Sequence, residues 1–410
     1  MTRRMKVLVS VYACEPDKGS EPGVGWNWVR QIARFHEVWA ITRANNREPI
    51  ERVWAKKPIS NIHWIYFDLP HYLKWWKKGQ RGIHLYYYLW QIGAYFIGKR
   101  LHNKVNFDLV HHLTFCKYWM PTFLAFLPVP FLWGPIGGAE DTPKAFYGTF
   151  SFRGRVYEGF RNAVRWLGEN DPFVQFTAKR TQAALATTSE TKRRLELLGC
   201  RCVKVFPQEG IGIYEIEELP FVRNTSHFRL VSIGRLLHWK GFHLGLIAFA
   251  QLMQQCPNSE YHIIGDGPEQ RSLERLVRRL GVEEKVRFWG SLTRQQVLRQ
   301  LAECDVLVHP SLHDSGGWVC LEAMAAGRPV ICLDLGGPAL QVTEETGFKV
   351  PAITPEQVVN DLMRAMLRLA SDPDCRKRMG EAAQKRVAEY FDWDKKGEWI
   401  REVYQTVPTQ

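Results

Sequence analysis

The chain has 410 residues, 45% of them hydrophobic, a composition that excludes a disordered protein and favours two domains with separate cores. No stretch reaches the roughly 18–20 uninterrupted apolar residues of a membrane span, and the N-terminal residues lack the apolar region of a signal peptide. We therefore expect a cytoplasmic protein. Nine cysteines without Cys-x-x-Cys pairs argue against a disulfide framework and against structural zinc.

The excess of positive over negative charge lies in the first half of the chain. Residues 1–224 contain 32 Lys and Arg against 19 Asp and Glu, an excess of +13, whereas residues 225–410 contain 23 of each. We therefore expect the first half to meet an anionic molecule or a membrane surface.

Apolar runs and amphipathic stretches alternate along the first half. Trp26, Val29 and Ile32 share one face of a predicted helix over Trp26–Phe35. Such alternation is typical of βαβ units and a parallel sheet. The predicted strands are Lys6–Val11, Glu37–Thr42, Ile62–Phe67, Phe107–His112, Val129–Trp133, Ala184–Thr188 and Val203–Phe206.

A glycine-containing loop, Glu21–Gly25, joins the first predicted strand to the first helix. Ligands of open α/β sheets bind outside the C-terminal ends of strands, and Gly23 would let the backbone approach a substrate. An ordinary tight turn is the alternative. The Gly-x-Gly-x-x-Gly fingerprint is absent from this loop, which argues against a dehydrogenase.

Residues 71–104 combine aromatic and basic side chains. The aromatic stretch Ile83–Ile97 follows a basic cluster that includes Trp75 and Trp76. Trp and Tyr beside Lys and Arg suit the headgroup layer of an anionic membrane, while a helix packed on the sheet with a solvated basic end is the alternative. A second basic, aromatic run covers Phe150–Leu167.

The second half repeats the alternation after a predicted linker at Tyr214–Ser226. A terminal helix is expected over Asp392–Gln405, after one or two charged helices over Ser371–Phe391. The predicted strands are Arg229–Ile233, Tyr261–Ile264, Val286–Trp289, Val306–Val308 and Val330–Leu333, and the predicted helices are Gly245–Gln255, Glu269–Leu280, Arg294–Ala302 and Trp318–Ala326.

Chemistry-bearing residues gather in this second half. Gly316 and Gly317 precede a helix, whose free N–H groups can receive a phosphate, and Glu322 one turn on can accept hydrogen bonds from two ribose hydroxyls. Arg235 and Lys240 bracket a loop after the first strand and can neutralise a diphosphate. Diphosphate beside ribose suggests a nucleotide.

Together these motifs resemble the retaining nucleotide-sugar glycosyltransferases of glycosyltransferase family 4, which have the GT-B fold. The resemblance covers residues 229–350 and is looser in the first half. It is carried by Gly234-Arg235 with Lys240-Gly241-Phe242, Gly265-Asp266-Gly267-Pro268, Phe288-Trp289-Gly290, Pro310-Ser311, and Glu322-Ala323-Met324-Ala325-Ala326-Gly327 with Pro329-Val330-Ile331.

The resemblance implies an α/β protein with two facing Rossmann-like domains. It places an acceptor-side domain at residues 1–222, a donor domain at 223–391, and a C-terminal helix at 392–410 that packs back on the first domain. The catalytic candidates that it implies are Arg235, Lys240, Asp314 and His112, and the donor-binding candidates are Gly23, Trp289, Gly290, Leu292, Ser315, Gly316, Gly317 and Glu322.

The sequence departs from the family's pattern at two places. Asp314 stands where the family usually has the first of two glutamates, in the unusual run His313–Gly317. The family's first-domain histidine corresponds to Leu113, which leaves His111 and His112 as candidates to contact the sugar. A histidine at a strand end is often a packing residue instead.

We expect transfer of a sugar with retention from a nucleotide-sugar donor to a lipid-linked or membrane-presented glycan. Because Arg235, Lys240 and helix N-termini can stabilise the leaving diphosphate, we expect neither a cofactor nor a metal requirement. Closure of the two domains would exclude water and limit hydrolysis of the donor.

Within enzymes, the alternative is a GT-B glycosyltransferase with a soluble small-molecule acceptor. An alternative from a different class is a non-catalytic nucleotide-sugar binding protein. The high pI alone would fit a nucleic-acid partner, but the donor pattern argues against one. Attachment to the inner face of the cell membrane through residues 71–104 is a further hypothesis.

Overall fold

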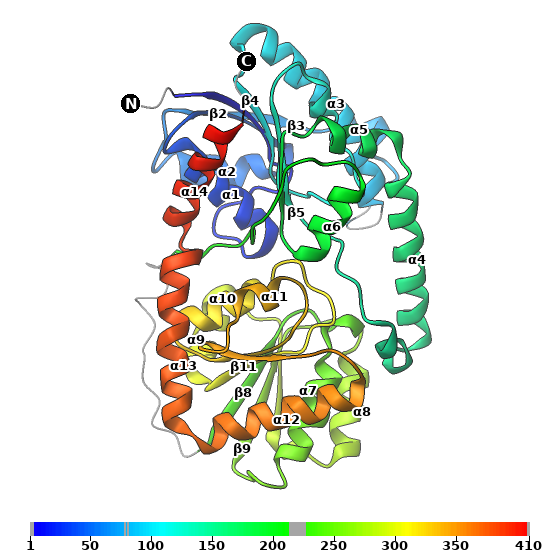
Figure 1. Cartoon of the computed structure of the whole chain (residues 1–410), viewed down its shortest axis with the longest axis vertical. Coiled ribbons are helices and arrows are strands. Elements are labelled where there is room, and N and C mark those ends of the chain that lie inside the picture. The colour runs from blue at the N-terminus through cyan, green and yellow to red at the C-terminus, as the bar shows by residue number, and fades with distance from the viewer. Residues whose placement is uncertain (1–3, 78, 80–81, 213–226, 408–410) are drawn as a thin grey trace. The chain divides into compact units, whose positions relative to one another are not determined.

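The structure is a computed structural model, and it describes residues 4–77, 79, 82–212 and 227–407. The chain forms two compact units (Figure 1). The first unit consists of Met1–Ala139, Arg161–Gln208 and Trp393–Gln410, and the second of Glu140–Phe160 and Glu209–Asp392.

The first unit is built on a parallel seven-stranded sheet, as the alternating pattern predicts. Its two central strands pair with Val7 opposite Leu109. Strand order reverses between these two strands, and ligands of open parallel sheets bind at such a point. The order is β3 (Ile62–Phe67), β2 (Glu37–Arg43), β1 (Lys6–Ser10), β4 (Leu109–His112), β5 (Phe131–Ile136), β6 (Ala183–Ala186) and β7 (Val203–Val205).

The first helix of this unit begins earlier than the sequence pattern predicts. Helix α1 covers Ser20–Ala33, so the predicted start at Trp26 is wrong. Pro22 is compatible with a first helical turn, which has no N–H bond to lose, and Glu21 complements the helix dipole there. The other helices are α2 (Arg47–Trp54), α3 (Ile83–Val105), α5 (Pro172–Arg180) and α6 (Ser189–Leu197), with α4 (Phe152–Glu169) shared by both units.

The terminal helix α14 (Trp393–Thr406) packs against α1 in the first unit, as expected (Figure 1). The Gln31 amide donates to the Asp394 carboxylate at 3.0 Å. Near the end of the helix, the Tyr404 hydroxyl lies 2.7 Å from Nδ1 of the buried His111. The C-terminal segment therefore completes the core of the first unit.

The second unit contains a parallel six-stranded sheet with the same kind of reversal at its centre. Residues along a strand alternate between the two cores: Leu230 faces one core and Val231 the other. The order is β10 (Val286–Gly290), β9 (Ser259–Ile264), β8 (Phe228–Ile233), β11 (Val306–His309), β12 (Val330–Leu333) and β13 (Gly347–Val350).

Helices cover both faces of this second sheet. One core contains residues of α7 (Phe242–Leu252), α8 (Gln270–Leu280) and α12 (Pro355–Ser371), and the other contains residues of α9 (Arg294–Glu303), α10 (Trp318–Ala325) and α13 (Pro373–Arg386). The pattern did not predict β13, α11 (Gly336–Gln341) or α12, although Thr354 caps α12 and Pro355 occupies its first turn.

The segment Glu140–Phe160 belongs to the second unit although it precedes most of it in sequence. Phe146, in the 3₁₀ helix η4 (Lys144–Thr149), and Phe150 are buried in the core formed with α7 and α12. The linker predicted at Tyr214–Ser226 and the boundary predicted at 222/223 lie outside the described residues.

The buried histidines of the first unit predict acid sensitivity. Burial lowers the pKa of His111 and of His112 to about 3, against about 6.5 in an unfolded chain. Below pH 6.5 the unfolded state binds more protons, so each histidine lowers the free energy of unfolding by about 2 kcal/mol at pH 5. We expect the thermal unfolding midpoint to fall between pH 7.5 and pH 5.

The variant His111→Gln should show a shallower dependence of the midpoint on pH, while the exposed His71→Gln should match the natural protein. A midpoint that does not change over this pH range would contradict the assignment of buried neutral histidines.

Candidate functional site

The predicted donor motifs meet at the C-terminal edge of the second unit's sheet. The loop Gly234–Lys240 follows β8 and the loop Pro310–Gly317 follows β11, the two strands between which strand order reverses. Ligands of such sheets bind at this point. Arg235 is exposed there, and Lys240 ends the short helix η6 (His238–Lys240).

The central contact of the site is an ion pair between Lys240 and Asp314, one residue from each loop. Nε2 of His309 lies 3.2 Å from the same carboxylate. Burial alone would raise the pKa of Asp314, but the charge of Lys240 and the His309 hydrogen bond outweigh it and hold the pKa well below its usual range. Asp314 is therefore an anion held between a cation and an imidazole.

The two loops touch through their backbones as well. Gly241 has φ +67°, and a Cβ there would collide with the carbonyl oxygen of Pro310, so a glycine is required. The amide of Leu312 donates to the carbonyl of Trp239 at 2.8 Å. The motifs Lys240-Gly241 and Pro310-Ser311, which are far apart in sequence, are therefore in direct contact in the fold.

The Ser315–Gly317 segment is held from several sides and leads into α10, with Gly317 in the left-handed conformation at the helix N-cap. The amide of Gln341 donates to the carbonyl of Gly316 at 2.5 Å. The Ser315 hydroxyl donates to the Glu140 carboxylate at 2.5 Å. The backbone N–H groups that the sequence assigned to a phosphate or sugar therefore sit on a fixed loop.

Two buried glutamates next to this loop escaped the sequence analysis. Glu140 contacts Ser315, and the Glu209 carboxylate lies so close to Gly316 that any Cβ there would collide with it. Both glutamates are far from the loop along the chain, so no local sequence motif connects them to it. Hydrophobic patterning carries no signal for such residues.

Glu322 lies in α10 and is paired with a residue that was not predicted. Nε of Arg294, at the start of α9, lies 3.1 Å from the Glu322 carboxylate. The same guanidinium lies 5.8 Å from the centre of the Trp318 ring. Arg294 thus orients the carboxylate that the sequence assigned to a ribose.

Trp289, Gly290 and Leu292 lie at the C-terminal end of β10, one strand beyond β9 in the sheet order. The guanidinium of Arg287 stacks over the Trp289 ring at 3.7 Å. Gly290 has φ +66° with open space around its Cα, so the backbone is accessible there.

An additional cluster ties both loops to the segment before them. The Glu158 carboxylate is fully buried and lies 3.0 Å from Nε2 of His238 and 3.4 Å from Nε2 of His313. The rings of Tyr157, Trp239 and His313 stack in one column. His238 and His313 stand next to the Lys240 and Asp314 motifs, so Glu158 holds the two loops together.

The candidates of the first unit are buried within that unit. Gly23 is a buried residue of α1 rather than a loop residue, which corrects the predicted loop Glu21–Gly25. His112 is buried, with Nε2 2.8 Å from the Tyr87 hydroxyl, and His111 bonds to Tyr404 and to the Gly134 carbonyl. Their contact with a sugar stays a prediction.

Lys117, which follows β4 in the first unit, belongs to a polar cluster that the sequence analysis did not predict. Nζ of Lys117 is 3.3 Å from Nε2 of His84 and 5.1 Å from the centre of the Trp119 ring. Burial lowers the pKa of Lys117 to about 8. Burial raises the pKa of Glu21 above its usual value. The Glu21 carboxylate accepts a hydrogen bond from the Phe115 amide.

Most of the aromatic stretch in residues 71–104 faces the protein. Tyr86, Tyr87 and Trp90 of α3 are buried in the core of the first unit, which is the packed alternative considered above. Tyr72 and Trp75 each expose 72% of their surface. Among the helices of the described residues, none has the length and apolar character to cross a bilayer.

The sequence contains two Asp-x-Asp runs, Asp372–Asp374 and Asp392–Asp394, and three of these four aspartates have partners within the fold. Asp372 caps α13 by accepting from the Cys375 amide at 2.9 Å, two residues before Asp374. Asp392 pairs with Ile211 in a β-bridge, and Asp394 bonds to Gln31.

Comparison with known proteins finds similarity in the second half of the chain. Residues 216–386 match the family described as Glycosyl transferases group 1. D-inositol 3-phosphate glycosyltransferase of Corynebacterium urealyticum is 32% identical over 185 residues, which are 43% of this chain and 42% of that protein. Glycogen synthase of Mycobacterium tuberculosis is 32% identical over 181 residues, covering 44% and 43% of the two chains. The match thus spans less than half the length of these relatives.

Solved structures match nearly the whole chain. HepE of Anabaena, in complex with UDP and glucose, has a TM-score of 0.64 at 18% identity and covers 98% of this chain and 100% of its own. The lipopolysaccharide outer core galactosyltransferase WaaB has a TM-score of 0.65 at 14% identity over 98% and 100% of the chains. With its two parallel sheets and its terminal helix, this chain has the GT-B fold.

Glu158 yields a prediction about stability. In Glu158→Gln, His238 loses a charged, fully buried acceptor, and such a hydrogen bond contributes about 1.5–3 kcal/mol. His313 loses the carboxylate that lies 3.4 Å from its Nε2. We expect the thermal unfolding midpoint to fall by roughly 5 °C. The exposed Glu196→Gln, which breaks a surface pair with Lys192, is the control and should leave the midpoint unchanged. Equal midpoints for the two variants would show that Glu158 does not hold the loops.

Proposed function

We propose that this protein transfers a sugar from a nucleotide-sugar donor to an acceptor. The observation that carries the proposal is the Lys240–Asp314–His309 cluster at the point of strand reversal, within the stretch that matches the glycosyltransferase family. Because HepE was solved with UDP and with UDP-glucose, UDP-glucose is the first donor to test.

The chemistry follows from where charge develops. Cleavage of the sugar–phosphate bond leaves negative charge on the diphosphate and positive charge on the anomeric carbon. Lys240, Arg235 and the N–H groups at the start of α10 would stabilise the former. Asp314 keeps Lys240 in place before the donor arrives, so little reorganisation is needed during the reaction.

The donor would lie across the edge of the sheet. We assign the ribose to Glu322, which Arg294 orients, and the base to the backbone around Trp289, Gly290 and Leu292. Asp314 and Ser315 to Gly317 would face the sugar. We further propose that transfer proceeds with retention and without a metal ion, as in the family that the motifs resemble.

For the acceptor we propose a lipid-linked or membrane-presented glycan. The positive excess of residues 1–224 and the exposed rings of Tyr72 and Trp75 support it. A soluble acceptor is the second candidate, since 2-deoxystreptamine glucosyltransferase of Streptomyces kanamyceticus is 31% identical over 196 residues.

Release of free nucleotide from a panel of nucleotide sugars tests the donor proposal. We expect turnover of at least one donor, and Lys240→Ala should lower kcat by on the order of 100-fold or more because the leaving diphosphate loses a cation. Glu322→Ala should raise KM for the donor. Lys349→Ala, which removes an exposed lysine paired with Asp334, is the matched control and should keep full activity.

Since Lys240→Ala leaves Asp314 without its cation, the double variant Lys240→Met/Asp314→Asn removes both charges and guards against misfolding. A double variant that folds and still turns over the donor at the natural rate would overturn the assigned site.

Co-sedimentation with vesicles that contain anionic lipid tests the membrane hypothesis. We expect Tyr72→Ser/Trp75→Ser to reduce the bound fraction severalfold, because two exposed rings no longer enter the headgroup layer. The exposed Tyr390→Ser of the second unit serves as control. Equal sedimentation of all three proteins would favour the soluble acceptor.

A further inference from the structure

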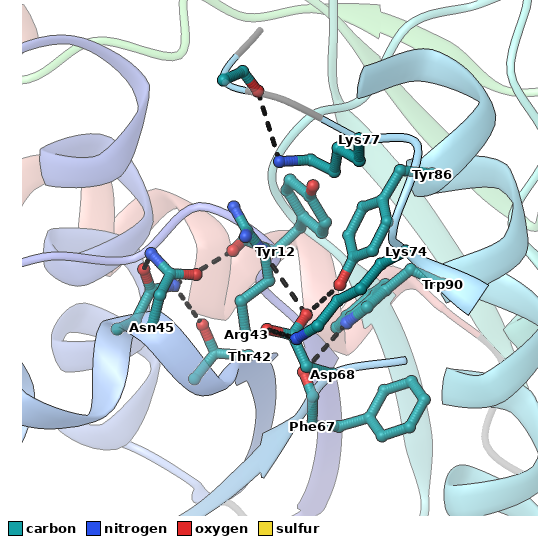
Figure 2. Close-up of polar contacts among 12 residues, drawn as sticks. Tyr12, Thr42, Arg43, Asn45, Phe67, Asp68, Lys74, Lys77, Tyr86 and Trp90 are labelled. Atoms are coloured by element: carbon teal, nitrogen blue, oxygen red, sulfur yellow. Dashed lines mark hydrogen bonds and ion pairs between the residues drawn. The ribbon is translucent and has the colours of Figure 1, made fainter. Parts of the chain in front are cut away.

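A cluster of cations lies at the C-terminal edge of the first unit's sheet (Figure 2). Arg43 is the last residue of β2, and Asp68 directly follows β3. Lys74 and Lys77 come from the segment after the 3₁₀ helix η2 (His71–Leu73), and Tyr86 comes from α3. The C-terminal ends of neighbouring parallel strands are where such sheets bind ligands.

The charges in this cluster do not balance. Asp68 accepts a hydrogen bond from the Tyr86 hydroxyl. Its carboxylate lies 3.7 Å from Nε of Arg43 and 3.8 Å from Nζ of Lys74, distances beyond a direct hydrogen bond. Nζ of Lys77 lies 5.1 Å from the centre of the Tyr86 ring. Three cations against one carboxylate leave a local excess of two positive charges.

Two buried polar atoms in the cluster also lack partners. Nε of Arg43 and the hydroxyl of Tyr12 are buried without a hydrogen-bond partner among the described residues. The Arg43 guanidinium lies 5.1 Å from the centre of the Tyr12 ring, so both atoms belong to the same cluster. Buried polar groups in folded proteins are nearly always satisfied, so these two point to a missing acceptor.

Burial and the neighbouring charge of Arg43 lower the pKa of Lys77, with Lys74 contributing in the same direction. An anion placed among these cations would raise that pKa again and supply the missing acceptor atoms. Arg43 can offer its planar fork and the lysines can act as point charges, the combination that proteins use for phosphate.

We propose that Arg43, Lys74 and Lys77 form an anion site that binds a phosphate group of the acceptor. The acceptor role rests on the proposed function, whereas the anion site itself does not. The exposed Tyr72 and Trp75 flank Lys74 in sequence, so the phosphate can belong to a lipid headgroup or to a soluble phosphorylated molecule.

Isothermal titration with inorganic pyrophosphate tests the site. The background is Arg235→Gln/Lys240→Met/Asp314→Asn, which removes the two cations of the candidate donor site without leaving the Asp314 carboxylate unpaired. In this background, adding Arg43→Gln/Lys77→Gln should weaken binding by about tenfold or more. Arg52→Gln/Lys56→Gln, which removes two exposed cations of the first unit, is the charge-matched control and should bind like the background. Unchanged affinity in the Arg43/Lys77 variant would overturn the proposal.

The single variant Lys77→Gln repeats the test with less disturbance of the fold, and circular dichroism checks that each variant is folded. If folded Lys77→Gln also binds pyrophosphate like the background, the site is refuted on this second measurement.

Vesicles distinguish the two sources of phosphate. If the site takes a lipid phosphate, sedimentation with phosphatidylcholine vesicles containing phosphatidic acid should fall in Arg43→Gln/Lys77→Gln and on addition of pyrophosphate. If the site takes a soluble phosphate, pyrophosphate binding should depend on these residues while sedimentation does not. If Arg43→Gln/Lys77→Gln keeps both pyrophosphate binding and vesicle sedimentation, the proposed site is wrong.

The proposed function and this inference can fail separately. If no nucleotide sugar is turned over but pyrophosphate binding still depends on Arg43 and Lys77, the anion site stands and its role toward an acceptor falls. If donor hydrolysis occurs but the Arg43→Gln/Lys77→Gln variant binds pyrophosphate normally, the donor proposal stands and this inference falls.

Discussion

The ion pair between Lys240 and Asp314 is the interaction on which the candidate site depends. It joins the loops after β8 and β11 where the order of strands reverses, and both partners are largely removed from solvent. Removing one partner of such a pair costs about 3–5 kcal/mol, because a charge is left buried without compensation. The pair therefore holds the Lys240 ammonium group in a fixed position, so the side chain need not move when it meets an anion.

The surroundings of this pair show how much of the site is supporting structure. Gly241 permits the close approach of the loops, Glu158 draws together two histidines beside the motif residues, and Arg294 orients Glu322. These residues need not touch a substrate to matter. Small displacements of the supporting groups would misplace Lys240 and the N–H groups of α10, and positioning contributes strongly to rate.

The two units differ in the balance of cations and carboxylates in their charged clusters. In the second unit, Lys240 is paired with Asp314 and Arg294 is paired with Glu322. In the first unit, Arg43, Lys74 and Lys77 outnumber Asp68. The overall charge excess of residues 1–224 therefore has at least one local, structured component.

The sequence by itself determined the fold class, the strands of the first sheet, five of the six strands of the second sheet, and the motifs around Lys240 and Glu322. Alternating apolar runs report burial directly, and Gly234-Arg235, Lys240-Gly241 and the run from Glu322 to Gly327 lie close together along the chain. It failed at the start of α1, where polar residues and Pro22 resemble a loop, and it overlooked α12.

The tertiary structure alone decided which charges meet. Asp314 with Lys240, Glu158 with His238, Arg294 with Glu322 and Arg43 with Asp68 are contacts between residues far apart in sequence. It also showed that the aromatic rings of α3 are mostly core, leaving Tyr72 and Trp75 exposed. Patterning records whether a residue is buried, whereas the partner of a buried charge is set by the packing of distant segments.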